Sequence, residues 1–165
     1  MTTPALGIDI GRVLMCPIDP TDGRPDSSFL ELPDDQAIDL PASPHVWDAV
    51  PDLVRAFDGR VWLVSKAGAR IEAKTRLWLA HQRFFDRVGL PDEAVRFCRR
   101  RPDKRVHAIE LGLTHFVDDR SDVLAALVGA VPNLYLFGAQ RDPVPAFAKH
   151  VADWAIARGA VLADL

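Results

Sequence analysis

The feature that most constrains this chain is a repeated alternation between short apolar runs and segments with the spacing of amphipathic helices. The expected strands are 6–10, 60–65, 94–98, 114–118 and 133–138. Strands that alternate with helices are typical of a parallel sheet with helices on both faces. The sequence therefore predicts an α/β fold, a Rossmann-like three-layer sandwich with a five-stranded parallel sheet.

The expected helices occupy the gaps between these strands. They run from 43 to 58, 69 to 88, 103 to 111 and 121 to 127, with a further helix in the tail from about 145. The pattern leaves open a short extra strand around Val151. Lys74 is expected as a solvated residue of the second helix.

Length and charge narrow the class of protein. A chain of 165 residues corresponds to about one domain, which we expect to span residues 1–165. The net charge of −3 is not that of a basic nucleic-acid-binding module, so nucleic acid is not an expected partner. The first residues do not read as a signal peptide, and no apolar run reaches the ~18 residues of a membrane span. We therefore expect a cytoplasmic protein without a membrane partner, in which Cys16 and Cys98 are free thiols.

The segment between the first two strands differs from the rest of the chain. Residues 16 to 45 hold six of the 13 prolines and many aspartates, which favours a loop or a small hairpin over a helix. Within it, Phe29–Leu32 is expected as a short strand. We predict a small flap over roughly 15–45, too short for a large cap domain, and therefore an open site.

Polar and charged side chains end several of the predicted strands. Asp9 ends the first strand, Ser65 the second, and Asp118-Asp119 the fourth, while Lys104 begins the helix after the third. Since right-handed crossovers bring all the strand C-termini to one edge, these side chains should converge where ligands bind in such sheets.

This set of side chains suits phosphoryl chemistry. Carboxylates hold Mg²⁺, which neutralises a phosphate and lets an aspartate attack it, while a hydroxyl and an ammonium hold the phosphoryl oxygens. Simpler alternatives are that Asp9 is a turn residue and that Asp118-Asp119 interact with the helix that starts at Ser121. The sequence leaves three roles open for Asp122: a metal ligand, an acid that supports the metal ligands, or a partner of that helix terminus.

The order of these motifs resembles the haloacid dehalogenase superfamily of phosphohydrolases over nearly the whole chain. The matching segments are Gly7–Leu14, Val61–Ser65, Lys104 and His115–Asp122. The resemblance implies that Asp9 is a nucleophile that forms an aspartyl-phosphate, with Ser65 and Lys104 as its catalytic partners. It implies Mg²⁺ ligands at Asp9, the Gly11 carbonyl, Asp118 and Asp119. It implies a substrate-binding group of Gly11, Arg12, Ser65 and Lys66, with Lys66 also an alternative to Lys104.

One position departs from the family pattern. Phosphatases of this superfamily carry a second aspartate two residues after the nucleophile, as general acid and base, and here that residue is Gly11. Such a group contributes roughly 10²–10⁴-fold to the rate. Either another residue supplies the proton, with Asp19, Asp22 and His115 as candidates, or the phosphoenzyme stalls, or the site binds without turnover.

These observations predict a Mg²⁺-dependent phosphatase of an unknown phosphorylated small molecule or macromolecule. The alternative is a weakened or inactive module of the same fold that binds phosphate or a partner. A receiver domain fits less well, since its phosphorylated aspartate follows the third strand. The basic run Arg99–Arg101, near Lys104 and Arg105, is either a solvated loop or a phosphate contact. The sequence does not indicate the oligomeric state.

Overall fold

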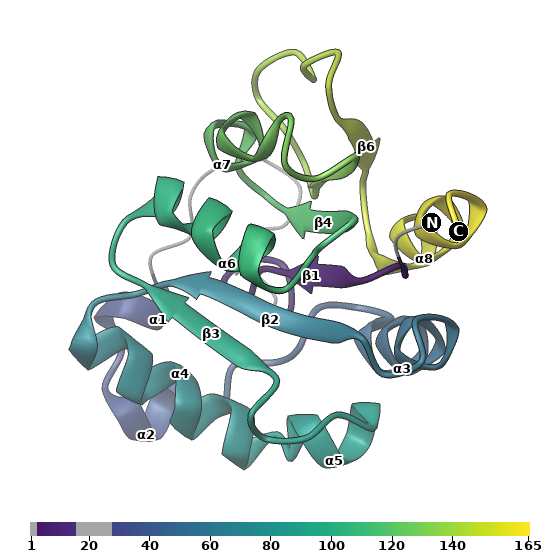
Figure 1. Ribbon diagram of the computed structural model, residues 1–165. Coiled ribbons are helices and arrows are strands. Elements are labelled where there is room, and N and C mark those ends of the chain that lie inside the picture. Colours follow the sequence, from purple (N-terminus) through teal and green to yellow (C-terminus); the bar gives the residue numbers. More distant parts are fainter. Residues whose placement is uncertain (1–2, 16–27) are drawn as a thin grey trace.

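The computed structural model describes residues 3–15 and 28–165 and contains a six-stranded sheet (Figure 1). Its strands are β1 (Leu6–Ile8), β2 (Val61–Lys66), β3 (Val95–Cys98), β4 (His115–Asp118), β5 (Asn133–Phe137) and β6 (Lys149–Val151). They lie in the order β3-β2-β1-β4-β5-β6, and every pair is parallel. The predicted α/β fold with a parallel sheet is confirmed.

The predicted number of five strands is wrong, whereas the short extra strand left open around Val151 is present as β6 (Lys149–Val151). The sixth strand, β6, pairs with β5 at the edge of the sheet, in the register Phe137↔Val151. It has only three residues, of which Val151 is buried while Lys149 and His150 are exposed. So short an edge strand lacks the apolar run that marks a buried strand in sequence, and its pairing depends on the neighbouring β5.

Helices cover both faces of the sheet and form two apolar cores. The larger core includes buried residues of α3 (Val46–Ala56), α4 (Ala69–His81), α5 (Phe84–Val88) and α8 (Trp154–Ala163). The smaller core, on the other face, includes residues of α6 (Lys104–Glu110) and α7 (Ser121–Leu127). Cys98 is a buried free thiol, whereas Cys16 lies outside the described residues. No helix in the described ranges is long and apolar enough to span a membrane.

The predicted helix over 69–88 is two helices. The first, α4, ends at His81, and Arg83 then adopts a left-handed conformation with φ of 50° before α5 begins. This break turns the chain so that Phe84 packs against Trp78 and Trp47. Apolar spacing alone did not reveal it, because the apolar residues continue on both sides of the break.

The predicted flap strand at Phe29–Leu32 is also wrong. The described part of the flap holds two one-turn helices, α1 (Ser28–Glu31) and α2 (Asp34–Ala37), which pack near α4 (Figure 1). Lys74 of α4 donates to the carbonyl oxygens of Phe29 (3.1 Å) and Leu32 (2.7 Å), so it satisfies carbonyls at the end of α1. A tertiary contact of this kind, rather than local periodicity, specifies the helix. Residues 16–27 of the flap lie outside the described residues.

Candidate functional site

The predicted polar side chains lie where the order of the sheet reverses, between β1 and β4. Ile8 of β1 is paired with Val117 of β4, so the next residues, Asp9 and Asp118, leave the two strands side by side. The Asp9 amide continues the ladder by donating to the Val117 carbonyl at 3.0 Å. Such a reversal opens a crevice at the carboxyl edge of a parallel sheet, which is the usual ligand site of doubly wound folds.

Lys104 joins the two aspartates from α6. Its Nζ is 2.7 Å from Asp9 Oδ1 and 2.7 Å from Asp118 Oδ2, and only 2% of Lys104 is exposed. Burial opposes the charged form of this lysine, but the Asp118 and Asp9 carboxylates outweigh burial and raise its pKa. Lys104 therefore stays cationic and fixes one oxygen of each aspartate.

Asp119 completes the acidic cluster and pairs with a second cation. Its Oδ2 lies 2.9 Å from Arg12 Nε. Burial, together with the charges of Asp118 and Asp9, raises the pKa of Asp119 to about 8. Burial and the Asp9 charge likewise raise the pKa of Asp118 to about 6, although Lys104 opposes this. Three carboxyl groups thus face two paired cations in the described part of the site, which is why the pKa values of Asp118 and Asp119 are raised.

The donor set fits a divalent cation that prefers oxygen ligands. One oxygen from each of Asp9, Asp118 and Asp119 lies within 4.8 Å of the other two. Within the described ranges, Lys104 contacts Asp9 Oδ1 and Asp118 Oδ2, Arg12 contacts Asp119 Oδ2, and Asp118 Oδ1 accepts from the Arg120 amide at 3.0 Å. Mg²⁺ needs few protein oxygens because it keeps several waters. These residues are therefore suited to hold such an ion.

A glycine beneath the cluster was missed by the sequence reasoning. A Cβ built at Gly7, in the middle of β1, would lie 2.5 Å from Phe116 Cδ2 and 2.7 Å from Leu113 Cδ1. The Phe116 ring packs against this bare backbone, and its centre is 5.8 Å from Lys104 Nζ. Gly7 thereby permits the packing that supports Lys104. A glycine inside an apolar strand is the signal that could have found it.

Two other predicted residues lie at the same edge. Ser65 is a buried residue near the end of β2, two positions beyond the Leu63 that pairs with Ile8. Lys66 follows it and is exposed. Lys66 makes no contact with the three carboxylates, which identifies Lys104 as the lysine of the cluster.

Gly11 is exposed in the turn after β1, and a Cβ built on it meets no described atom within 4 Å. Its backbone is not in the left-handed region that would favour glycine. The absence of a side chain at this position is therefore not a packing requirement within the described residues.

Two of the candidate acids are not in the cluster. Asp122 forms a bidentate pair with Arg120, at 3.0 Å for each bond, on the surface. His115 lies at the amino end of β4, where it contacts Thr114 and Asn133 and stacks on Tyr135. Its proposed role as the missing acid is wrong, because strand direction places it at the opposite edge from Asp118. Asp19 and Asp22 lie outside the described residues.

The basic run after β3 is largely paired with acids. Arg99 is 2.8 Å from Glu72, and Arg100 pairs with Asp103 at 3.0 Å. Arg105 instead donates to the carbonyls of Ala126 and Val128. Much of this positive charge is thus balanced on the protein surface, which favours the solvated-loop interpretation.

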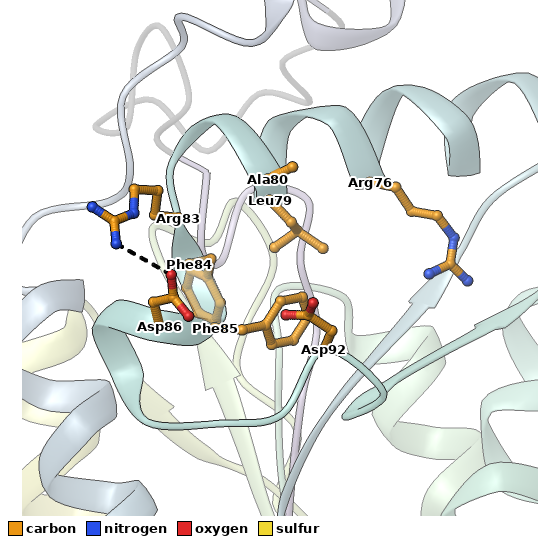
Figure 2. Close-up of a pocket in the computed structure, with 8 residues that line it drawn as sticks. All are labelled: Arg76, Leu79, Ala80, Arg83, Phe84, Phe85, Asp86 and Asp92. Carbon is orange, nitrogen blue, oxygen red and sulfur yellow. Dashed lines mark hydrogen bonds and ion pairs between the residues drawn. The ribbon is translucent and has the colours of Figure 1, made fainter.

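A surface hollow elsewhere on the molecule lacks comparable chemistry. Figure 2 shows it beside α4 and α5, with Phe84 and Phe85 in its wall and an Arg83–Asp86 ion pair at its rim. None of the predicted site residues lines it. The acidic cluster at the carboxyl edge therefore remains the strongest candidate site in the described part of the chain.

Comparison with known proteins adds no assignment: neither a protein-family model nor a curated protein matches this chain. The functional interpretation accordingly depends on the geometry of the site.

Proposed function

We propose that this protein is a Mg²⁺-dependent phosphohydrolase, similar to the haloacid dehalogenase superfamily, that forms an aspartyl-phosphate on Asp9. The observation that carries the proposal is the junction of Asp9 with Asp118, Asp119 and Lys104 at the reversal of the sheet order. The substrate is a phosphorylated small molecule or macromolecule, and the expected compartment is the cytoplasm.

The roles of the residues follow from their contacts. Lys104 holds Asp9 Oδ1, so Asp9 Oδ2 is the oxygen that attacks phosphorus. The bond between phosphorus and the leaving-group oxygen breaks, and the bonding electron pair departs with that oxygen. Water then attacks the aspartyl-phosphate, which releases phosphate and restores the Asp9 carboxylate. Ser65 and Lys66 bind phosphoryl oxygens at the end of β2.

A divalent ion held by Asp9, Asp118 and Asp119, with the Gly11 carbonyl as a further ligand, would offset the phosphate charge during this attack. The excess of carboxylates over cations in the cluster supports this role.

The second candidate is a module of the same fold that binds phosphate or a partner with little turnover. The observation that favours it is Gly11, which supplies no acid where the resemblance requires one. Departure of an alkoxide without protonation is slow, so alkyl phosphates should distinguish the two candidates better than activated esters.

The first test is stopped-flow hydrolysis of p-nitrophenyl phosphate with Mg²⁺, comparing the protein with Asp9→Asn. Nitrophenolate leaves without a proton, so the first step does not need an acid at position 11. We expect a burst of about one product per site, or steady turnover, and loss of both in Asp9→Asn. No product from folded, Mg²⁺-bound protein would contradict the phosphohydrolase and favour the binding module.

A second test restores the acid. Because the described residues leave room for a Cβ at position 11, Gly11→Asp should be accommodated without repacking. We expect turnover of an alkyl phosphate to rise by about 10²-fold or more. Gly11→Asn, with a side chain of the same shape, is the matched control and should not produce this gain.

A further inference from the structure

Arg12 belongs to the substrate-binding group that the resemblance implies, and it also contacts Asp119 of the acidic cluster. It is a non-glycine residue with φ of 60°, in the left-handed region that L-residues rarely adopt. The turn that holds it is fixed on both sides. Leu14 N donates to the Ile10 carbonyl at 2.9 Å, and Trp154 Nε1 donates to the Val13 carbonyl at 2.8 Å. The fold thus maintains an unfavourable backbone conformation at the residue that contacts Asp119.

The two cations of the site are held very differently. Lys104 is buried between two carboxylates, with a 2.7 Å contact to each. Arg12 has one carboxylate contact within the described residues, Nε to Asp119 Oδ2, and 26% of its side chain is exposed. Displacing Lys104 would strip two buried aspartates of their counter-ion, whereas displacing Arg12 breaks one contact near the surface. Arg12 is therefore the exchangeable cation.

We propose that Arg12 is a counter-ion that the metal displaces from Asp119, and that the released guanidinium then binds the phosphoryl group. This inference depends on the proposed function, since it assigns metal and phosphate to the same site. A divalent ion and Arg12 compete for the negative charge of Asp119. A guanidinium freed from a carboxylate is a strong, bidentate ligand for phosphate oxygens. Metal binding therefore frees the Arg12 guanidinium to bind the phosphate.

The proposal predicts opposite effects on the two ligands when Arg12 is removed. Without its competitor, Mg²⁺ alone should bind more tightly. Without its guanidinium ligand, inorganic phosphate should bind the Mg²⁺-loaded protein more weakly. Coupling between two ligands typically amounts to 5–150-fold, and we expect changes of about fivefold or more in each direction. A residue with a merely structural role would not move the two affinities in opposite directions.

The experiment is calorimetric titration of the full chain with Mg²⁺ alone, and then with inorganic phosphate at saturating Mg²⁺. The variants are Arg12→Gln and Arg12→Gly, and the latter also removes the unfavourable φ, so it should fold at least as well. Arg120→Gln is the matched control, because Arg120 is close in sequence to Asp119 but its guanidinium pairs with Asp122. We expect tighter Mg²⁺ and weaker phosphate in both Arg12 variants, and smaller changes in the control.

Unchanged or weaker Mg²⁺ binding in both Arg12 variants, or unchanged phosphate binding, would overturn the role of Arg12. Equal effects in Arg120→Gln would also overturn it, since they would reflect overall charge. If the wild type binds Mg²⁺ and forms product through Asp9 while the Arg12 variants behave like it, only this inference fails. If neither the wild type nor the variants bind Mg²⁺, both the proposed metal site and the role of Arg12 are wrong.

Discussion

Two lysines of this protein are almost completely buried, and they have very different surroundings. Lys74 is 1% exposed and Lys104 is 2% exposed. Lys74 donates to the carbonyl oxygens of Phe29 and Leu32, and its Nζ lies 3.6 Å from Oδ1 of the largely exposed Asp34. Lys104 instead contacts two carboxylates at 2.7 Å, beside a third that it does not neutralise.

The difference shows which kind of buried charge marks a candidate site. Around Lys74 the hydrogen bonds attach α1 to α4. Around Lys104 the carboxylates outnumber the cations, and the pKa values of Asp118 and Asp119 are raised. Burial of a cation is common to both regions, but among the described residues around Lys104 the carboxylates outnumber the cations, which a bound metal ion could balance.

The largest effect should come from Lys104→Met. The substitution leaves Asp9 and Asp118 buried without their cation, which costs about 3–5 kcal/mol of unfolding free energy at pH 8. The pKa of Asp118 is raised to about 6, so at pH 5 this acid can bind a proton in place of the lost cation and the loss should shrink. Urea denaturation at both pH values measures this loss. A loss of equal size at pH 5 and pH 8 would contradict the role of Lys104 as the counter-ion of the buried carboxylates.

Lys74→Met should have a smaller effect of a different kind. It removes the donor to two carbonyls, and Asp34, the carboxylate with which Lys74 pairs, is largely exposed, so we expect a loss of about 2 kcal/mol. The loss should be the same at pH 5 and pH 8, and Mg²⁺ binding should not change. A pH-dependent loss would mean that the two lysines have more similar roles than their contacts indicate.

The pH dependence of the wild type should reveal the excess charge. The pKa of Asp119 is raised to about 8 in the fold, above its unfolded value near 4. The stability that comes from its protonation is therefore complete below about pH 4 and is lost as pH rises through 8. Between pH 6 and pH 8 we expect the unfolding free energy to fall by about 2 kcal/mol. Asp119→Asn should remove most of this dependence of the unfolding free energy on pH. An unchanged dependence in that variant would contradict its assignment to Asp119.

The smallest effect should be stabilisation by Mg²⁺. At a concentration of about five times its Kd, a ligand that binds only the folded state adds about 1 kcal/mol. The ion must displace the proton from Asp119, so the rise in Tm should be larger at pH 8 than at pH 6. Asp118→Asn should remove the rise, while Asp122→Asn, a surface acid next to the cluster, should retain it. A rise that survives Asp118→Asn would place the ion elsewhere.

Local pattern explains what sequence reasoning predicted well. The strand that ends at Asp118 and the helix Ser121–Leu127 were predicted with these ends, because apolar runs and polar boundaries mark them locally. The convergence of Asp9, Lys104 and Asp118 was also predicted, since parallel strands bring their carboxyl ends to one edge. The chemical roles of these residues remain predictions.

Long-range contacts explain what the sequence did not reveal. Lys74 was expected in solvent, because nothing in its own helix shows that the carbonyls of α1 would pack over it. The one-turn helix α1 was expected as a strand for the same reason. The pairing of Arg12 with Asp119 joins two turns that follow different strands, and only the folded chain shows that they meet.

The central claim is that Asp9 accepts a phosphoryl group at this cluster. The most direct measurement is mass spectrometry of protein quenched in acid after brief reaction with p-nitrophenyl phosphate and Mg²⁺. We predict one added phosphoryl group, located on Asp9, removed by hydroxylamine and absent from Asp9→Asn. A phosphoryl group on another residue, or one that still forms in Asp9→Asn, would contradict the claim, as would nitrophenol release without any Asp9 adduct.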